Sequence, residues 1–154
     1  KHYDYPFSMA DDLDLAYAPP YASAKDPVNM AGYIIDNILA NRIEQFHCED
    51  VERLPRDGRA ILLDTRTPRE YAMGHADGFI NIPVDDLRVR LYELDPKKPV
   101  YVMCQSGLRS YIAVCILNHS GFKAYNFSGG YRFYQTVMQD RQFSEKSFPC
   151  GMEN

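Results

Sequence analysis

The sequence predicts an α/β domain built on a mostly parallel sheet with helices on both faces. Four short apolar runs, each long enough for a buried strand, occur at residues 60–63, 79–82, 100–103 and 124–127. Segments with helical spacing separate or follow these runs, and strands that alternate with helices are typical of parallel sheets. Continuous apolar strands also indicate burial on both faces of the sheet, which the helices must cover.

The first 42 residues do not share this alternation. Pro19 and Pro20 predict an extended chain, because proline restricts its own backbone and that of the residue before it. Asp26 followed by Pro27 is typical of a helix start, and the apolar positions that follow predict a helix at residues 28–42. Such an apolar stripe needs a partner surface, which most often lies within the same domain.

The other elements follow in order from residue 43. Residues 43–47 have room for a first strand, and residues 55–58 predict a turn. A proline precedes the strand at residues 100–103, and Gly121 ends the helical spacing that follows this strand. Between and after the strands, we expect helices at residues 68–73, 84–94, 110–120 and 131–138.

Cys104 lies at the point where a predicted strand ends and a predicted helix begins. The free backbone N–H groups and partial positive charge of a helix start favour the thiolate form of a cysteine. Gly107 allows a tight turn whose N–H groups converge on one point, and Arg109 supplies a nearby cation. We therefore expect Cys104 to act as a nucleophile rather than as a buried structural cysteine.

The spacing from the cysteine to the arginine separates two kinds of cysteine chemistry. Cysteine phosphatases use Cys-x5-Arg, because a phosphoryl group must fit between the sulfur and the backbone amides. In this chain four residues separate Cys104 from Arg109. A loop that is shorter by one residue has room for a single extra sulfur on the cysteine, but it is tight for a tetrahedral phosphate.

Residues 61–134 resemble a rhodanese domain in four blocks of matching order and spacing. The blocks are residues 62–71 (LLDTRTPREY), 74–83 (GHADGFINIP), the loop at 104–109 (CQSGLR) and 126–131 (NFSGGY). A cysteine and an arginine at this spacing would be weak evidence alone, whereas the four blocks together make the resemblance specific.

In rhodaneses the cysteine takes a sulfane sulfur from a donor, holds it as a persulfide and gives it to a nucleophilic acceptor. The resemblance implies that Cys104 is this nucleophile and that Arg109 binds the anionic donor. It implies that Asp64 and Arg66 brace the loop. The sulfur would be held by the amides of the loop, which are those of Gln105, Ser106, Gly107, Leu108 and Ser110.

A second resemblance covers the segment before the rhodanese blocks. Residues 14–32 (DLAYAPPYASAKDPVNMAG) are similar to the last segment of the dimerisation domain in flavin-dependent pyridine-nucleotide disulfide reductases. Within that family they most resemble coenzyme A-disulfide reductases and NADH oxidases, some of which carry a C-terminal rhodanese domain. The resemblance implies a helical remnant of the dimerisation domain at residues 1–42, a rhodanese-like domain at residues 43–154, and a homodimeric full-length protein. It matches Tyr17 to a tyrosine that donates a proton in the partner subunit's active site.

Those reductases bind FAD through a Gly-x-Gly-x-x-Gly fingerprint and also bind NAD(P)H. The fingerprint does not occur in this sequence, so we expect the chain to bind neither cofactor and assign both to reductase domains outside it. Because the sequence begins at Lys1 rather than at methionine, we expect a fragment of a longer protein. His75 has no second His or Cys at ligand spacing, so we expect no metal site.

Composition excludes several classes of partner. A net charge of −4 over 154 residues gives no basic patch for nucleic acid or anionic lipid. No apolar run is long enough to cross a bilayer, and the start lacks the order of a signal peptide, so we expect a cytoplasmic protein. The four cysteines have no paired spacing and are expected to be reduced. We expect Cys115 to pack in the core and assign no role to Cys48 or Cys150.

The preferred interpretation is a sulfurtransferase domain fused to an FAD- and NAD(P)H-dependent disulfide or polysulfide reductase. Persulfide formed at Cys104 would pass to the reductase centre through a thiol acceptor, with coenzyme A persulfide or disulfide as a candidate. Two alternatives remain at this point, namely a cysteine-based phosphatase or arsenate reductase and a non-catalytic docking module. The chemical identity of the sulfur donor stays open.

Overall fold

The computed structural model describes residues 27–146. The chain divides into two units, with the boundary between Glu44 and Gln45. In the first unit, helix α1 (Pro27–Leu39) confirms the helix predicted after Asp26, although it ends before residue 42. Its large apolar side chains are exposed, namely Tyr33, Ile34, Ile38 and Leu39.

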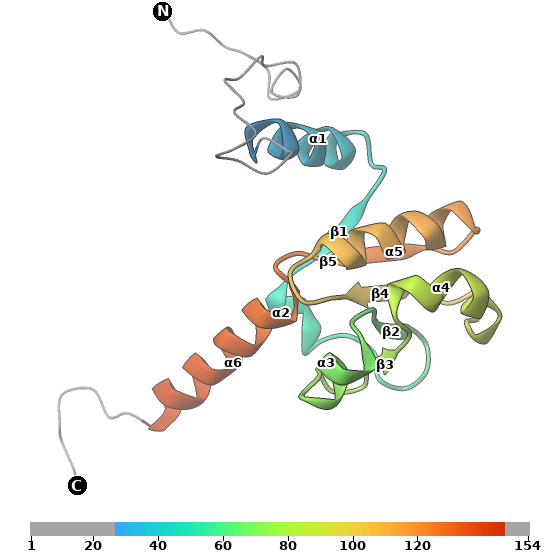
Figure 1. Ribbon diagram of the computed structural model, residues 1–154. Helices are drawn as coiled ribbons and strands as arrows, with labels where there is room; N and C mark the ends of the chain where they lie inside the picture. Colours follow the sequence, from blue (N-terminus) through green and yellow to red (C-terminus); the bar gives the residue numbers. More distant parts are fainter. Residues whose placement is uncertain (1–26, 147–154) are drawn as a thin grey trace, which may run out of the picture. The chain divides into compact units, whose positions relative to one another are not determined.

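A five-stranded sheet with the order β1-β5-β4-β2-β3 forms the centre of the chain from residue 44 onward (Figure 1). Strand β2 pairs in parallel with both β3 and β4, and β4 pairs in parallel with β5. These pairings confirm the mostly parallel α/β fold. The strands are β1 (Glu44–Phe46), β2 (Ile61–Asp64), β3 (Ile80–Asn81), β4 (Val100–Met103) and β5 (Ala124–Phe127).

Helices follow the strands largely as the sequence predicts. They are α2 (Cys48–Val51), α3 (Pro68–Ala72), α4 (Val84–Arg90) with a 3₁₀ turn at Leu91–Glu93, α5 (Leu108–His119) and α6 (Gly130–Lys146). The short helix α2 was not expected, and α6 continues well beyond residue 138. Residues 139–143 of α6 are exposed and mostly polar, so this part of the helix lacks the apolar stripe from which a helix is recognised in a sequence.

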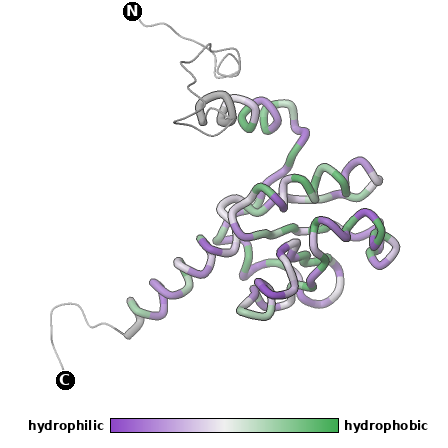
Figure 2. The backbone as a smooth tube through the Cα atoms, in the orientation of Figure 1, coloured by the Kyte–Doolittle hydropathy of each residue, from purple (hydrophilic) through white to green (hydrophobic). Residues whose placement is uncertain are grey.

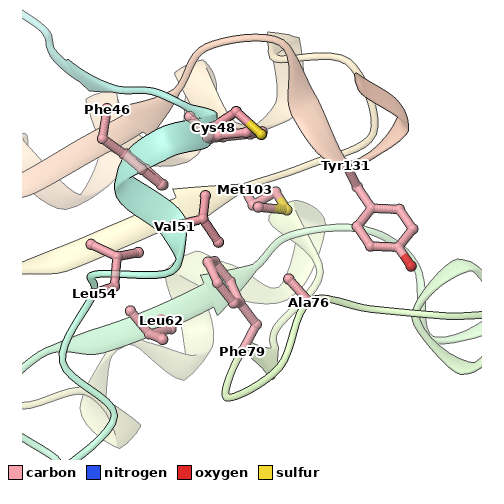
Figure 3. Close-up of a cluster of buried hydrophobic side chains, with 10 residues drawn as sticks. Phe46, Cys48, Val51, Leu54, Leu62, Ala76, Phe79, Met103 and Tyr131 are labelled. Carbon is pink, nitrogen blue, oxygen red and sulfur yellow. The ribbon is translucent and has the colours of Figure 1, made fainter. Parts of the chain in front are cut away.

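Helices cover both faces of the sheet. On one face, α2 and the start of α6 enclose a cluster of apolar side chains that includes Phe46, Met103, Phe127 and Tyr131 (Figure 3). On the other face, α5 packs against β4, β5 and α4. In Figure 2, hydrophobic residues lie along these central strands and also along α5. Each fully buried large side chain, such as Phe127, contributes about 1.5–3 kcal/mol to folding.

The prediction that Cys115 packs in the core is wrong. Cys115 is exposed on α5, and Leu108 and Ile112 are exposed as well. The side chains that α5 buries are those of Ser110, Ala113, Val114, Ile116 and Leu117. A serine and an alanine belong to this buried face, so the large apolar residues alone do not define the buried side of the helix. Within residues 27–146, no helix is long and apolar enough to cross a membrane.

Candidate active site

Cys104 follows the last residue of β4 and is fully buried. Two donors from the next turn of chain converge on its Sγ atom. The backbone N–H of Gly107 donates to it at 3.1 Å, and the hydroxyl of Ser110 lies 3.3 Å from it. The same hydroxyl lies 3.0 Å from the carbonyl oxygen of Gly107, so it can donate to either group. Sulfur in this position is therefore held by donors that suit an anion.

The conformation of Gly107 makes this convergence possible. Its φ of 111° lies in the left-handed region, where a side chain would be strained, and it is the residue from which α5 starts. The turn brings the backbone N–H of Gly107 and the hydroxyl of Ser110 to the sulfur, whereas Leu108 projects into solvent. Gln105 turns its side chain toward Arg66.

Asp64 and Arg66 form a buried ion pair behind the loop. The Nε of Arg66 donates to both carboxylate oxygens of Asp64 at 3.0 Å, and its Nη2 donates to Oδ2 at 2.7 Å. Nη1 of Arg66 reaches Oε1 of Gln105 at 3.3 Å, and the guanidinium lies 3.9 Å from the centroid of the Tyr131 ring. This one side chain thus connects the end of β2 to the cysteine loop and to α6.

Asn81 also supports the segment at the end of β2 that carries Asp64 and Arg66, although the sequence alone assigns it no role. Its Nδ2 donates to the carbonyl oxygens of Asp64 and Arg66 at 2.9 and 2.8 Å. A third acceptor for Arg66, after Asp64 and Gln105, is the carbonyl oxygen of Gly74, at 2.8 Å from Nη2. These contacts fix the direction in which the Arg66 side chain leaves the backbone.

Arg109 is paired with Glu70, a residue that sequence reasoning did not place at the site. Nη1 donates to Oε2 and Nη2 to Oε1 of Glu70, each at 2.7 Å, in a bidentate arrangement. The hydrogen bonds from Arg109 are the largest of the causes that lower the pKa of the Glu70 carboxyl from 4.5 to about 2. The same hydrogen bonds raise the pKa of the Arg109 guanidinium, and the charge of Cys104 adds to that effect.

The sequence does contain a signal for Glu70, but it is the signal of a helix start. Thr67 and Glu70 make a capping box at the start of α3, with the backbone N–H and hydroxyl of Thr67 donating to Oε2 at 2.9 and 2.7 Å. Thr67-x-x-Glu70 therefore predicts a helix start from the sequence, but not the partner that the carboxylate has on a distant loop.

The start of α6 holds the opposite side of the cysteine loop. The backbone N–H groups of Tyr131 and Arg132 donate to the carbonyl oxygens of Cys104 and Gln105 at 2.7 and 3.2 Å. Because the C=O and N–H of a trans peptide point in opposite directions, these bonds direct the next two amide N–H groups of the loop away from α6.

Gly130 allows this approach of α6 to the loop. A Cβ atom at this position would lie 2.5 Å from the carbonyl carbon and oxygen of Gln105 and from the nitrogen of Ser106. The backbone of Gly130 also has a φ of 71°. Only glycine satisfies both conditions without moving the loop.

A hollow of about 160 Å³ lies beside the loop. Its volume suits a small substituent rather than a large cofactor. Arg66 and Glu70, one member of each ion pair, line this hollow. The other lining residues are Met73, Gly74, Gln105, Tyr131 and Gln135.

The remaining predicted residues are not brought to this site. Tyr17 and Cys150 lie outside the described residues. Cys48 is buried in the cluster under α2, and this burial is the main cause that raises the pKa of its thiol. His75 stacks on Tyr71 at 3.9 Å between ring centroids, with its Nδ1 3.2 Å from the carbonyl oxygen of Tyr71.

Comparison with known proteins agrees with this arrangement. The crystal structure of reduced Bacillus anthracis CoADR-RHD is 42% identical, with a TM-score of 0.81, and the match covers 88% of this chain and 24% of that one. A NAD-dependent persulfide reductase from A. fulgidus is 34% identical, with a TM-score of 0.67, over 82% of this chain and 22% of that one. The tRNA uridine(34) hydroxylase of Sodalis glossinidius (strain morsitans) is 31% identical over 120 residues, which are 71% of this chain and 34% of the relative.

The chain thus spans about a third or less of the length of each of these three proteins. The family model of the rhodanese-like domain matches residues 47–136, which include the cysteine loop, both ion pairs and the start of α6. The chain therefore belongs to the rhodanese-like domain family.

Proposed function

We propose that this rhodanese-like sulfurtransferase domain carries sulfane sulfur as a persulfide on Cys104. The observation that carries the proposal is the convergence of the Gly107 N–H and the Ser110 hydroxyl on a fully buried Sγ atom. Donors in this arrangement stabilise a thiolate before the transfer and a terminal persulfide sulfur after it. The guanidinium of Arg109 is near enough for the charge of Cys104 to raise its pKa, although Glu70 is its direct partner.

The transfer balances without an external oxidant or reductant. The Cys104 thiolate attacks the outer sulfur of a donor, a new S–S bond forms, and the S–S bond of the donor breaks with its electron pair on the leaving group. An acceptor thiolate or cyanide then attacks the outer sulfur of the Cys104 persulfide. This second step releases the acceptor with its added sulfur and restores the Cys104 thiolate.

The loop dimensions favour sulfur over phosphate. Gly107 already contacts Sγ, and α6 closes the other side of the loop by its bonds to the carbonyls of Cys104 and Gln105. A single added sulfur needs less space than a tetrahedral phosphate with three further oxygens. We therefore place the phosphatase or arsenate-reductase reaction behind sulfur transfer and make it an outcome of the test.

We further propose that the domain works within an FAD- and NAD(P)H-dependent disulfide or polysulfide reductase. The match to CoADR-RHD covers 88% of the chain and so extends beyond residues 47–136. Residues 137–154 are too few to account for the difference, so the match includes part of the segment before residue 47. This supports the assignment of residues 1–42 to the reductase part of a longer protein, with FAD and NAD(P)H in its other domains.

In such a protein the acceptor would be a thiol, with coenzyme A as the candidate, and the coenzyme A persulfide that forms would deliver the sulfur to the flavin centre. The exposed apolar side chains of α1 suit a helix that is covered in the full-length homodimer. Tyr17 would then contribute to the partner subunit's active site. A reducing cytoplasm would keep Cys104 in the thiol form that the reaction requires.

The experiment compares three proteins with matched substrates. Native protein, Cys104→Ala and Cys115→Ala receive a sulfane-sulfur donor with cyanide as the acceptor, and thiocyanate is measured. We expect equal turnover in the native protein and Cys115→Ala, because Cys115 is exposed on α5, and none in Cys104→Ala. Turnover that persists in Cys104→Ala would overturn the proposal. Hydrolysis of an aryl phosphate that depends on Cys104, without thiocyanate formation, would instead support the phosphatase.

A further inference from the structure

The two arginines that the sequence motifs place at the loop are both paired with carboxylates. Arg66 is bound to Asp64, and both are buried. Arg109 is bound to Glu70 through two hydrogen bonds of 2.7 Å. With the Cys104 thiolate included, these five groups carry a formal charge of −1, because two cations face three anions. An incoming anion therefore meets no uncompensated positive charge from this group of side chains.

Glu70 is also held in place from its own helix. The backbone N–H and hydroxyl of Thr67 both donate to its Oε2 atom. The carboxylate therefore lies at the start of α3, where the free N–H groups of a helix favour a negative charge. A donor anion that displaced Glu70 from Arg109 would have to compete with an intramolecular carboxylate already fixed in the bidentate geometry.

The neighbouring hollow also suits a donor of low charge. Its neutral lining side chains include those of Met73, Tyr131, Gln105 and Gln135. A thioether and an aromatic ring pack well against an organic substituent. The two charged side chains of the lining, those of Arg66 and Glu70, are already paired with Asp64 and Arg109.

We propose, on the basis of the sulfurtransferase function proposed above, that Glu70 determines the donor specificity of the site. By occupying Arg109, Glu70 selects singly charged or neutral organic donors, such as persulfides and thiosulfonates, over the thiosulfate dianion. Glu70 acts through Arg109 and is a positioning residue rather than a catalytic one. Both classes of donor undergo the same reaction, in which the sulfane sulfur moves to Cys104 and the leaving group is a thiolate, a sulfinate or sulfite.

Thiosulfate and methanethiosulfonate provide a matched pair of donors for the test. They have nearly the same shape, and a methyl group in the second replaces a charged oxygen in the first. Attack by the Cys104 thiolate releases sulfite from thiosulfate and methanesulfinate from methanethiosulfonate. A change in the ratio of their kcat/KM values therefore reports on charge rather than on size.

The variant Glu70→Gln removes the charge, while glutamine still serves the capping box with Thr67. We expect its kcat/KM for thiosulfate to rise about tenfold, mainly through KM, which corresponds to about 1.4 kcal/mol. The value for methanethiosulfonate should rise only about threefold, because the interaction energy is proportional to the charge of the donor. The ratio of the two values therefore rises about threefold.

Glu93→Gln is the matched control, because it removes the same charge from another arginine–carboxylate pair, that of Glu93 with Arg90, and leaves the Glu70–Arg109 pair in place. We expect it to leave the donor ratio unchanged. A ratio in Glu70→Gln that equals the native ratio, or a change of equal size in Glu93→Gln, would overturn the proposal.

The salt dependence of the native protein tests the same idea without a variant. If the pairing of Arg109 with Glu70 leaves a site that repels the thiosulfate dianion, salt screens this repulsion. The kcat/KM for thiosulfate then rises with salt relative to that for methanethiosulfonate. A fall of this ratio with salt would show that a free cation binds thiosulfate, and it would contradict the role given to Glu70. Failure of the native protein to take sulfur from either donor would instead refute the proposed function itself.

Discussion

The backbone N–H of Tyr131, at the start of α6, donates to the carbonyl oxygen of Cys104 at 2.7 Å. Cys104 is thus fixed from behind by a helix that follows a different strand. Arg132 makes the next bond of the same kind, to the carbonyl oxygen of Gln105 at 3.2 Å. The free N–H groups at the start of α6 therefore bind the loop in place of a capping side chain.

Gly130→Ala should disrupt this contact. The new Cβ would lie 2.5 Å from backbone atoms of Gln105 and Ser106, which cannot move without displacing the loop. We expect sulfur transfer to fall at least about tenfold and stability to fall by about 1–3 kcal/mol. Gly121→Ala is the control, since Gly121 also has a positive φ, of 85°, but no atom within 4 Å of the added Cβ. Equal transfer rates in the two variants would contradict the role of Gly130.

Asp64→Asn should destabilise the fold strongly. It removes the charge that neutralises Arg66, and both side chains are almost completely buried. Leaving one partner of a buried ion pair uncompensated costs about 3–5 kcal/mol, which denaturant unfolding would measure. Glu93→Gln breaks the more exposed pair with Arg90 and should leave the unfolding midpoint unchanged. A small effect of Asp64→Asn, similar to that of Glu93→Gln, would show that Arg66 finds another partner.

Because of the Glu70–Arg109 pair, we expect the stability of the protein to depend on pH in the acidic range. The hydrogen bonds from Arg109 lower the pKa of Glu70 from 4.5 to about 2, so the folded state holds this carboxylate in its charged form. The stabilisation of the folded state by the charged Glu70 carboxylate is therefore complete above about pH 4.5 and is lost as the pH falls toward 2. We expect the stability difference between native protein and Glu70→Gln to be constant near neutral pH and to shrink in this acidic range. A difference that grew on acidification would have the wrong sign.

The cysteines outside the loop should differ in reactivity. Cys115 is exposed on α5, whereas Cys48 is buried and its thiol has a pKa raised by that burial. A maleimide should therefore modify Cys115 in the native protein and reach Cys48 only after unfolding. Mass spectrometry of the peptides would measure both rates. Labelling of Cys48 as fast as Cys115 in the native protein would contradict the placement of α2 over the sheet.

Most of the sheet could be predicted because most of its strands lie in short, mainly apolar runs. The expected segments at residues 100–103 and 124–127 coincide with β4 and β5. The buried face of α5 could be predicted only in part in this way. Ser110 and Ala113 are turned inward, since the core near the loop needs small side chains and a hydroxyl beside the sulfur, and neither residue stands out in an apolar pattern.

The site shows the same division between local and long-range information. The sequence places Cys104, Gly107 and Ser110 together because one turn of chain contains them. It does not show that Glu70 binds Arg109, which lies 39 residues further along the chain, or that Gly130 contacts the loop. Both relationships depend on how separate segments meet at the ends of parallel strands, and local propensity does not encode that.

The central claim is that Cys104 holds a transferable sulfur, and intact-protein mass spectrometry tests it most directly. Reduced native protein, Cys104→Ala and Cys115→Ala would each be exposed briefly to methanethiosulfonate, freed of donor and weighed, and then weighed again after addition of cyanide. We predict that the native protein and Cys115→Ala gain the mass of one sulfur atom and lose it to cyanide, and that Cys104→Ala gains none. A transferable sulfur on Cys104→Ala, or none on the native protein, would contradict the account.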